Sequence, residues 1–294
     1  MQFLTALVVD GILAGAIYAL VALSFVVVYK TSRVVNFALG EWMMLASGMV
    51  AAGFHALGLG LAGSLLLGFA GMLALALTFN RVVLRRVLGG PPITLIMVTL
   101  GLGALMRGVA GVVFRGIPGT MPVSVPQEPV LIVGVQVPAE RVAAAAIAIG
   151  CAVAMTLFFH LARTGVALRA IADDQQVAAA MGIDVHRHFA ITWVMVAGLS
   201  LIAGVLWTVV AVGSFGVVLV GLKVFPVVML GGLDSVLGAV LGGVAIGMLE
   251  SLTAGYIDPH VGGGFSSIAS YLVLVVALCV RPYGILGYAD AKRV

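Results

Sequence analysis

The chain has 294 residues, of which 63% are hydrophobic and 9% charged, with a formal net charge of +4 at pH 7. Ordinary soluble domains carry about 25% charged residues. This composition excludes a soluble protein with a water-covered surface and predicts an all-α, polytopic membrane helical bundle. No polar stretch is long enough to fold separately, so we expect one transmembrane domain over residues 1–294.

Apolar runs near the length of about 20 residues that crosses a bilayer predict nine membrane segments, and about eight to ten are compatible with the sequence. The first run carries Asp10, lacks a basic start and is too long for a signal peptide, so we expect it to remain as a helix. The second and seventh segments are candidates for re-entrant segments. The predicted segments are 5–29, 36–57, 62–80, 93–113, 140–160, 190–212, 216–231, 235–254 and 265–281.

Basic residues cluster after the first, third, fifth and last predicted spans and comprise 11 of the 15 Lys and Arg residues. Alternating the spans puts all four clusters on one side, which the positive-inside rule assigns to the cytoplasm. The N-terminus is then outside and the C-terminus cytoplasmic. This anchoring explains the net charge, so nucleic acid is not expected as a partner. The residues are Lys30, Arg33, Arg81, Arg85, Arg86, Arg163, Arg169, Arg187, Arg281, Lys292 and Arg293.

Asn36 and Glu41 place an amide and a carboxylate at the start of the second predicted span. An ionisable group at membrane depth is costly and usually faces a cavity or a partner. The two residues lie on different faces of a regular helix, so a backbone broken at Gly40 would let both line a translocation pathway. In the alternative interpretation, Glu41 only pairs with Arg33 or Lys30 near the interface.

The predicted cytoplasmic loop 161–189 is the longest inside loop and the most charged part of the chain. Ala172 or Asp173 is expected to cap a short helix from Gln175 to Met181, with Gly182 as the residue after its end. Such an amphipathic helix is suited to docking in a groove of another protein, and a plain solvated loop is the alternative. Its apolar face consists of Val177, Ala178 and Met181.

Glycines mark a turn and several helix contacts. Gly231 and Gly232 are expected to end the seventh span, and Asp234 with Ser235 to cap the eighth, which makes a tight structural turn. Glycines four residues apart within spans allow close helix packing in lipid, either inside one subunit or at a subunit interface. These pairs are Gly11 and Gly15, Gly238 and Gly242, and Gly243 and Gly247.

The remaining polar features are isolated. Within spans, Arg107 and Glu250 are expected to pair with each other or to point into the bundle, and Lys223 and Asp258 are expected near the outer surface. The outer segment 114–139 contains an alternating apolar stretch that predicts a short hairpin or an extended cover, with an ordinary loop as the alternative.

The sequence contains none of three well-known motifs for catalysis or nucleotide binding. There is no G-x-S-x-G elbow, no H-E-x-x-H and no Walker G-x-x-x-x-G-K-[ST] motif. Cys151 and Cys279 lie in apolar runs, and the H-x-H of His186 and His188 lacks a third ligand. We therefore expect no catalytic residue, no metal site, no cofactor and no ATPase site in this chain.

Three of these stretches resemble the permeases of branched-chain amino-acid ABC importers, in the shorter of their two paired permease types. N-F-A-L-G-E at 36–41 is similar to the family's N-F-A-H-G-E, and L-R-A-I-A-D-D-Q-Q-V-A-A-A-M-G-I at 168–183 to its R-A-x-x-x-D-x-x-x-A-x-x-x-G-I. G-G-L-D-S-V-L-G-A-V-L-G-G, which begins at Gly231, is similar to its G-G-x-G-S-x-x-G-A-x-x-G-G. The matches run in order through nearly the whole chain. Leu39 stands where the family usually has His, and Asp234 where it usually has Gly.

The resemblance implies a permease that moves branched-chain or related hydrophobic amino acids into the cytoplasm, while close relatives carry urea, short amides or aromatic acids. Segment 168–183 would be the coupling helix, with Arg169, Asp174 and Gly182 at the matching positions. The implied partners are two ABC ATPase subunits that bind the ATP, a periplasmic substrate-binding protein, and a second permease, either a related chain or a second copy. The implied location is the bacterial inner membrane.

Two other classes of protein remain alternatives. A secondary transporter or channel would use the intramembrane charges of Glu41, Arg107 and Glu250, but it leaves the cytoplasmic helix without a role. A membrane-embedded enzyme would need paired acid–base or nucleophilic residues at one depth, and the sequence offers no such pair.

Overall fold

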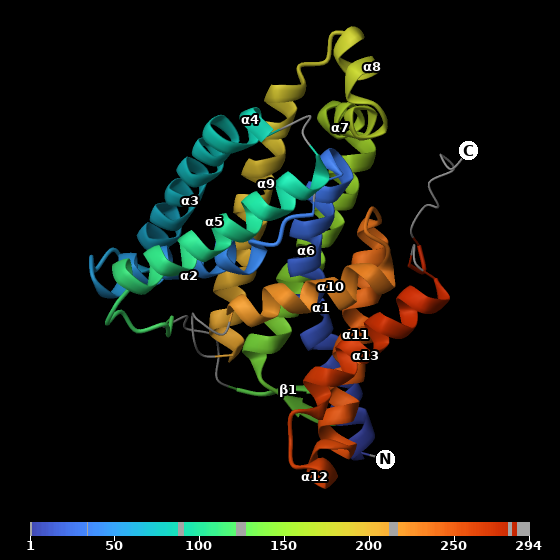
Figure 1. The fold of residues 1–294 in the computed structure, drawn as a ribbon. Coiled ribbons are helices and arrows are strands. Elements are labelled where there is room, and N and C mark those ends of the chain that lie inside the picture. Colours follow the sequence, from blue (N-terminus) through green and yellow to red (C-terminus); the bar gives the residue numbers. More distant parts are fainter. Residues whose placement is uncertain are drawn as a thin grey trace. The chain divides into compact units, whose positions relative to one another are not determined.

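The computed structural model describes residues 2–33, 35–87, 91–121, 128–211, 217–281 and 284–286. Within them, helices account for most of the chain (Figure 1). The predicted cytoplasmic residues Lys292 and Arg293 lie outside the described residues. The helices are α1 (Gln2–Ser32), α2 (Leu39–His55), α3 (Gly60–Phe79), the π-helical turn η1 (Asn80–Leu84), α4 (Arg85–Val87), α5 (Pro92–Val113), α6 (Ala139–Leu161), α7 (Arg163–Asp173), α8 (Gln175–Ala180), α9 (Val185–Ala211), α10 (Val217–Gly231), α11 (Val236–Tyr256), α12 (Asp258–Val261) and α13 (Phe265–Val280).

Each of the nine predicted membrane segments coincides with a helix, and the protein is a polytopic helical membrane bundle. Among the described residues, 6 helices are long and apolar enough to cross a membrane: α1, α3 continued through α4, α5, α6, α9 and α11. The other three segments, α2, α10 and α13, have 17, 15 and 16 residues. The predicted segment ends at 212 and 216 lie outside the described residues.

Contacts between residues divide the chain into two compact units, and each is described by itself. Unit 1 comprises residues 1–26, 124–156 and 223–294, and unit 2 comprises residues 27–123 and 157–222. The boundaries fall within α1, α6 and α10, so these three helices contribute to both units.

In unit 1, α1 and α11 touch backbone to backbone through glycine. A methyl group built on Gly15 would lie 2.6 Å from the carbonyl oxygen of Gly243, and one built on Gly11 would lie 2.6 Å from the Cα of Met248. Apolar side chains have no reason to leave lipid for one another, so close approach through small residues is what binds such helices. The two glycine pairs therefore pack helices inside one chain, which was one of the two alternatives left open by the sequence.

The turn between α10 and α11 has the predicted tight geometry. Gly232 has φ +115°, a left-handed conformation that favours glycine. Of the two predicted capping residues, Ser235 makes the cap, because its Oγ accepts a hydrogen bond of 3.0 Å from the N–H of Gly238. The predicted end of the seventh span at the glycine pair is confirmed, since α10 ends at Gly231.

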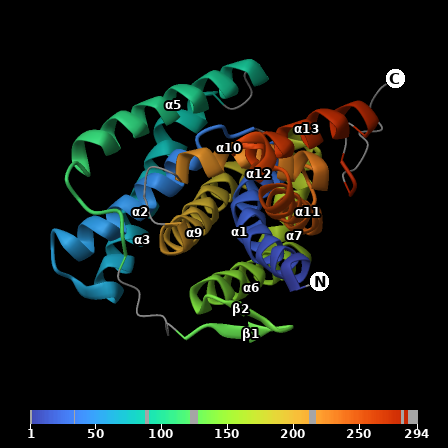
Figure 2. The same cartoon turned by 90° about the horizontal axis from the view of Figure 1, so that it is seen from below.

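Segment 114–139 contains the predicted short hairpin, and α6 follows the hairpin directly. Strands β1 (Val130–Ile132) and β2 (Val135–Val137) pair antiparallel, and Figure 2 shows them next to the start of α6. The two turn residues, Val133 and Gly134, have φ +50° and +78°, as a type I′ turn requires. Residues 122–127 of this segment lie outside the described residues.

In unit 2, α2 packs against α3, α5 and α9. Aromatic rings join three of these helices: the centroid of Trp193 lies 5.4 Å from that of Trp42 and 4.5 Å from that of Phe79. Trp42 has no exposed surface. Aromatic pairs at such centroid distances contribute about 0.5–1.5 kcal/mol per pair beyond their buried area, so they fix how these helices meet.

We predict that Gly15→Ala destabilises the protein by about 1–3 kcal/mol, because the new methyl group meets backbone that cannot move aside. The matched control is Gly108→Ala in α5, where a methyl group would have nothing within 4 Å. The control is expected to be neutral or more stable by up to about 1 kcal/mol from helix propensity. Thermal unfolding of the purified protein measures both, and equal midpoints would contradict the glycine contact.

Candidate functional site

The chain enters α2 through a short non-helical stretch. Val35 and Asn36 are non-helical, Phe37 and Ala38 form a turn, and α2 begins at Leu39. Asn36 is 1% exposed, and its Oδ1 accepts a hydrogen bond of 3.0 Å from the N–H of Ala38. The backbone break predicted for this region is therefore present and lies before the helix.

Gly40 has a different role from the predicted hinge, because it lies inside α2. A methyl group built on Gly40 would lie 2.7 Å from the carbonyl oxygen of Val218 in α10. The missing side chain lets the two backbones touch. The correction follows from packing: glycine at this position serves helix contact, while the Asn36 turn supplies the break.

Glu41 forms an ion pair with Arg107 of α5, in which Nη2 of Arg107 donates to Oε1 of Glu41. The Glu41 side chain is 6% exposed and that of Arg107 is 59% exposed. The alternative partners lie elsewhere: the ammonium of Lys30 is 5.3 Å from the ring centre of Phe159, and Arg33 lies over the ring of Tyr29. The sequence analysis considered Glu250 as the partner of Arg107, and that pairing is wrong.

One face of α5 follows the N-F-A-L-G-E stretch in register. Thr99 accepts a hydrogen bond of 3.4 Å from the N–H of Phe37, and four residues later a methyl group on Gly103 would lie 3.3 Å from the carboxylate of Glu41. Arg107 comes four residues after that. Residues spaced by four share a helix face, so Gly103 leaves room for the carboxylate between the two polar contacts.

A second ion pair lies in unit 1 and joins four helices. Glu250 of α11 accepts hydrogen bonds at Oε2 from Nζ of Lys223 (2.9 Å) and the hydroxyl of Tyr18 (2.6 Å). Its Oε1 accepts from the hydroxyl of Ser270 at 2.5 Å. Lys223 lies within α10 with 20% of its side chain exposed. An ammonium group inside a helix bundle is held by a carboxylate.

Loop 161–189 contains two helices, α7 and α8, of which only α8 was predicted from the sequence. Asp174 is the N-cap, because its Oδ1 accepts hydrogen bonds from the N–H groups of Gln176 (2.8 Å) and Val177 (3.0 Å). The predicted caps, Ala172 and Asp173, are instead the last residues of α7. A cap needs extended backbone, and of the two adjacent acids only Asp174 has it, at φ −155° and ψ 113°.

The end of α8 confirms the predicted role of Gly182. Its φ is +86°, and its N–H donates to the carbonyl of Ala179, while the N–H of Ile183 donates to that of Ala178. This pair of bonds is a Schellman motif, which closes a helix in a fixed geometry. A six-residue helix capped at both ends is a defined structural element, although it is too short to be stable alone.

The predicted apolar face of α8 is partly buried and partly exposed. Ala178 is 3% exposed, whereas Val177 is 60% and Met181 79% exposed. Figure 1 shows α7 and α8 beyond the start of α9, and both helices contact α9. The predicted Arg169 lies in α7 and is half-buried. Two large apolar side chains on a polar loop form an exposed patch suited to a partner.

Asp184 fixes the junction between this loop and α9. Its Oδ1 accepts a hydrogen bond of 3.0 Å from the N–H of Arg187, and this bond lowers the pKa of the carboxyl below its ordinary value. A lowered pKa means that the cap stabilises the fold above the unfolded-state pKa and is lost as the pH falls through the folded-state pKa. The junction is therefore fully formed at neutral pH.

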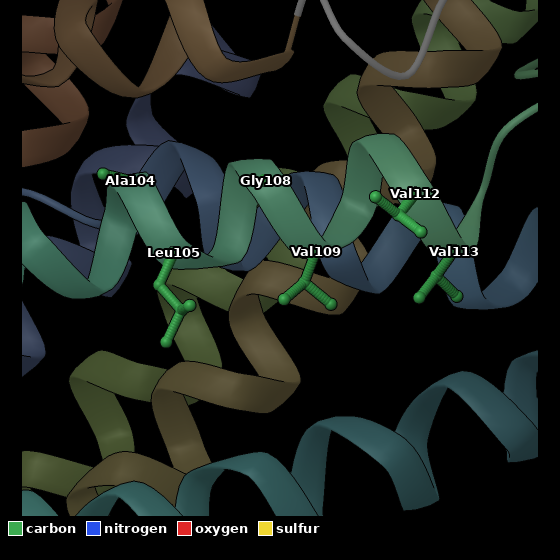
Figure 3. Close-up of a pocket in the computed structure, with 6 residues that line it drawn as sticks. All are labelled: Ala104, Leu105, Gly108, Val109, Val112 and Val113. Atoms are coloured by element: carbon green, nitrogen blue, oxygen red, sulfur yellow. The ribbon is translucent and has the colours of Figure 1, made fainter.

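An apolar groove of about 520 Å³ runs along α5. Figure 3 shows Leu105, Val109 and Val113 pointing in the same direction from this helix. Helical periodicity places the groove away from the face that carries Gly103 and Arg107. Its lining has no charged or hydrogen-bonding side chain, so it suits an acyl chain or another apolar helix. Among the described residues, no three His, Cys, Asp or Glu side chains gather where they could hold a metal ion.

A polytopic bundle with paired charges inside its spans and a capped helix on its loop is the architecture of a membrane transport subunit. The family model for "Branched-chain amino acid transport system / permease component" matches residues 7–280, and the chain belongs to this family.

Curated relatives match along nearly the whole chain. The high-affinity branched-chain amino acid transport system permease protein LivH of Escherichia coli K12 is 28% identical, over 97% of this chain and 96% of its own length. The corresponding protein BraD of Pseudomonas aeruginosa is 27% identical over the same shares. A probable permease LivH of Methanocaldococcus jannaschii is 32% identical over 48% of this chain and 46% of its own length.

A solved structure shares the fold. PsaBC from Streptococcus pneumoniae in complex with Fab has a TM-score of 0.52 and 16% sequence identity, and the match covers 96% of this chain and 93% of the other. At that identity the likeness concerns the fold alone.

We predict that Glu250→Leu destabilises the protein by about 3–5 kcal/mol, because it leaves the Lys223 ammonium buried without its carboxylate. The double variant Lys223→Leu with Glu250→Leu removes both charges and should recover most of the loss. Thermal unfolding of the purified protein gives both values. A double variant no more stable than Glu250→Leu would contradict the pairing as the cause.

Proposed function

We propose that this chain is the membrane-spanning subunit of an ABC importer that moves branched-chain or related hydrophobic amino acids into the cytoplasm. The observation that carries the proposal is the family match over residues 7–280, together with relatives named for this transport. The chain supplies the bundle and the loop, and ATP is bound by other subunits. Uptake of labelled leucine, with urea and a short amide as the competing cargoes, tests it in reconstituted vesicles.

The loop helix α8 is the proposed contact with an ATPase subunit. Val177 and Met181 stand four residues apart, so they form one exposed apolar face that can enter a groove of another protein. The Asp174 cap and the Gly182 closure hold this face in one conformation, so less conformational entropy is lost on docking. A force applied to α8 therefore moves it as one rigid body.

The assembly we propose contains two ATPase subunits, a periplasmic substrate-binding protein and a second permease, in the bacterial inner membrane. The second permease is either a related chain or a second copy of this one. The family match and the relatives' names support an importer of this composition in general terms. ATP-driven closure of the ATPases would act on α8 and open the bundle alternately to the two sides.

We predict that Met181→Glu and Val177→Glu each weaken docking of the ATPase subunit, because a charge enters an apolar contact. A central contact residue is worth about 2 kcal/mol or more, which corresponds to roughly 30-fold weaker association. Gln176→Glu is the matched control, since Gln176 is also exposed on α8 but lies outside the apolar face. Co-purification of the ATPase and leucine uptake are the measurements. Equal effects of all three variants would contradict a specific apolar contact.

We predict that the α8 loop is cytoplasmic and the hairpin is external. In a chain with Cys151→Ala and Cys279→Ala, a cysteine at Gln176 should react with a membrane-impermeant maleimide only in inside-out vesicles. A cysteine at Val133, which is 80% exposed in the hairpin turn, should react only in right-side-out vesicles. The physical reason is the clustering of basic residues on one side. Reversed labelling would overturn the orientation.

A further inference from the structure

The Glu41–Arg107 pair leaves hydrogen-bonding capacity unused. A guanidinium group has five N–H donors, and among the described residues Arg107 uses one of its nitrogens, in the bond to Oε1 of Glu41. Within the same described part of the chain, Oε2 of Glu41 has no hydrogen-bond partner and lies beside the space at Gly103. The pair therefore offers both a free acceptor and free donors.

A buried donor without a partner lies in the adjacent segment. Nδ2 of Asn36 has no hydrogen-bond partner among the described residues, although the side chain is 1% exposed. Leaving a buried donor unsatisfied costs about 1–3 kcal/mol. The N–H of Phe37, the next residue, donates to Thr99 on the α5 face that carries Arg107, so the turn that contains Asn36 lies beside this face of α5. Native proteins retain such groups mainly where a ligand, an ion or water completes them.

The Glu250 network shows what a purely structural charge cluster looks like in this chain. Both of its carboxylate oxygens accept hydrogen bonds, and they come from Tyr18, Lys223 and Ser270. Each oxygen of Glu250 thus has at least one hydrogen-bond donor, and we call this network saturated. Among the described residues Oε2 of Glu41 has none, and we call the Glu41–Arg107 pair open.

Position and access also distinguish the open pair. Arg107 lies 15 residues after the start of α5, about 22 Å along a helix that is long and apolar enough to cross a membrane. Its side chain is 59% exposed, so a solute can reach the guanidinium while Glu41 stays 6% exposed behind it. An exposed arginine at such depth is costly unless its charge meets a partner.

We propose that Glu41, Arg107 and Asn36 form a transient binding site for the charged head group of an α-amino acid during translocation. The carboxylate of the solute accepts hydrogen bonds from the free N–H groups of Arg107 and from Nδ2 of Asn36. Its ammonium group donates to Oε2 of Glu41. Positive and negative charges then alternate around a closed ring with no net charge, which is the least costly way to hold a zwitterion in a low dielectric.

This site reads the head group that all α-amino acids share and makes no contact that depends on the side chain. Branched-chain side chains differ only in methyl groups, and an apolar surface discriminates weakly among such differences. Selection among cargoes therefore has to occur before the solute reaches this pair. The inference rests on the proposed amino-acid cargo, and the experiment separates the two.

The decisive variant removes both charges together. In the complete reconstituted transporter, Glu41→Leu with Arg107→Leu leaves no unpaired buried charge, and such apolar replacement is often neutral or stabilising. If the pair only joins α2 to α5, this double variant takes up leucine like the wild type. If it holds the zwitterion, uptake falls at least about tenfold while thermal unfolding and ATPase assembly stay unchanged. Wild-type uptake by the double variant overturns the inference.

The Lys223→Leu with Glu250→Leu double variant is the control for loss of a buried pair, since that network is saturated. It is expected to keep leucine uptake per folded transporter within about twofold of the wild type. A drop equal to that of the Glu41 and Arg107 double variant would show a general effect of charge removal and contradict a specific site.

A second variant tests the same site with both charges in place. Gly103→Ala puts a methyl group 3.3 Å from the Glu41 carboxylate, where the ammonium group of the solute has to bind. Gly111→Ala, on the same helix with nothing within 4 Å of the new methyl group, is the matched control. Uptake is expected to fall several-fold in Gly103→Ala only, and equal uptake in the two variants counts against the inference. If the wild type carries urea and not leucine, the proposed cargo fails, and the site fails with it because urea has no charged head group. If the wild type carries leucine and the Glu41 and Arg107 double variant carries it equally well, only the site fails.

Discussion

The cost of placing a charge inside a membrane is the constraint on which this structure depends. Each of the three ion pairs among the described residues joins two different helices: Asp10 with Arg141, Glu41 with Arg107, and Glu250 with Lys223. Because a misplaced partner leaves a charge unpaired in low dielectric, these few residues discriminate strongly between alternative helix arrangements. Because only 9% of the residues are charged, these ion pairs specify which helices pack against each other.

Glycine residues let the helices approach closely enough to form these ion pairs. Tyr18 can reach Glu250 from the neighbouring helix because Gly15 lets the backbone of α1 approach that of α11. In unit 2, Gly103 does the same for Glu41, since any larger residue would press on its carboxylate. Small residues and ionisable residues are therefore coupled: the former set the distance at which the latter can bond. A substitution of a small residue therefore changes the geometry of the neighbouring ionisable residue.

The elements of this fold could be predicted from sequence, because the signals that define them are local. Each of the nine segments predicted from hydropathy over about 20 residues coincides with a helix, and the alternation from Val130 to Val137 indicated the hairpin. The charge partners could not be predicted in this way. Glu41 and Arg107 are 66 residues apart, and the other charges within spans, such as Lys223 and Glu250, allow several pairings that only tertiary packing selects. The scarcity of such charges was the one signal available.

Loop 161–189 shows a second limit of prediction from sequence. Sequence composition indicated a capped helix, but Asp173 and Asp174 are chemically identical, and backbone conformation alone decides which of them caps it. The helix α7 escaped prediction because its sequence, Arg163–Asp173, has little net hydrophobicity. Its buried residues, Gly165, Leu168 and Ile171, recur every three residues, which is a helical spacing that the sequence contains but a hydropathy average does not detect.

Unit 2 contains both the proposed contact with the ATPase and the open ion pair, and packed side chains connect them. Helix α8 contacts α9 near its start, Trp193 lies two turns into α9, and its ring packs on Trp42, the residue after Glu41. Close-packed aromatic groups transmit displacement because they cannot be compressed. By contrast, the saturated Glu250 network in unit 1 resists rearrangement, since any movement breaks hydrogen bonds that the bilayer cannot replace. Helix α9 therefore links the proposed ATPase contact on α8 to Trp42, the neighbour of Glu41.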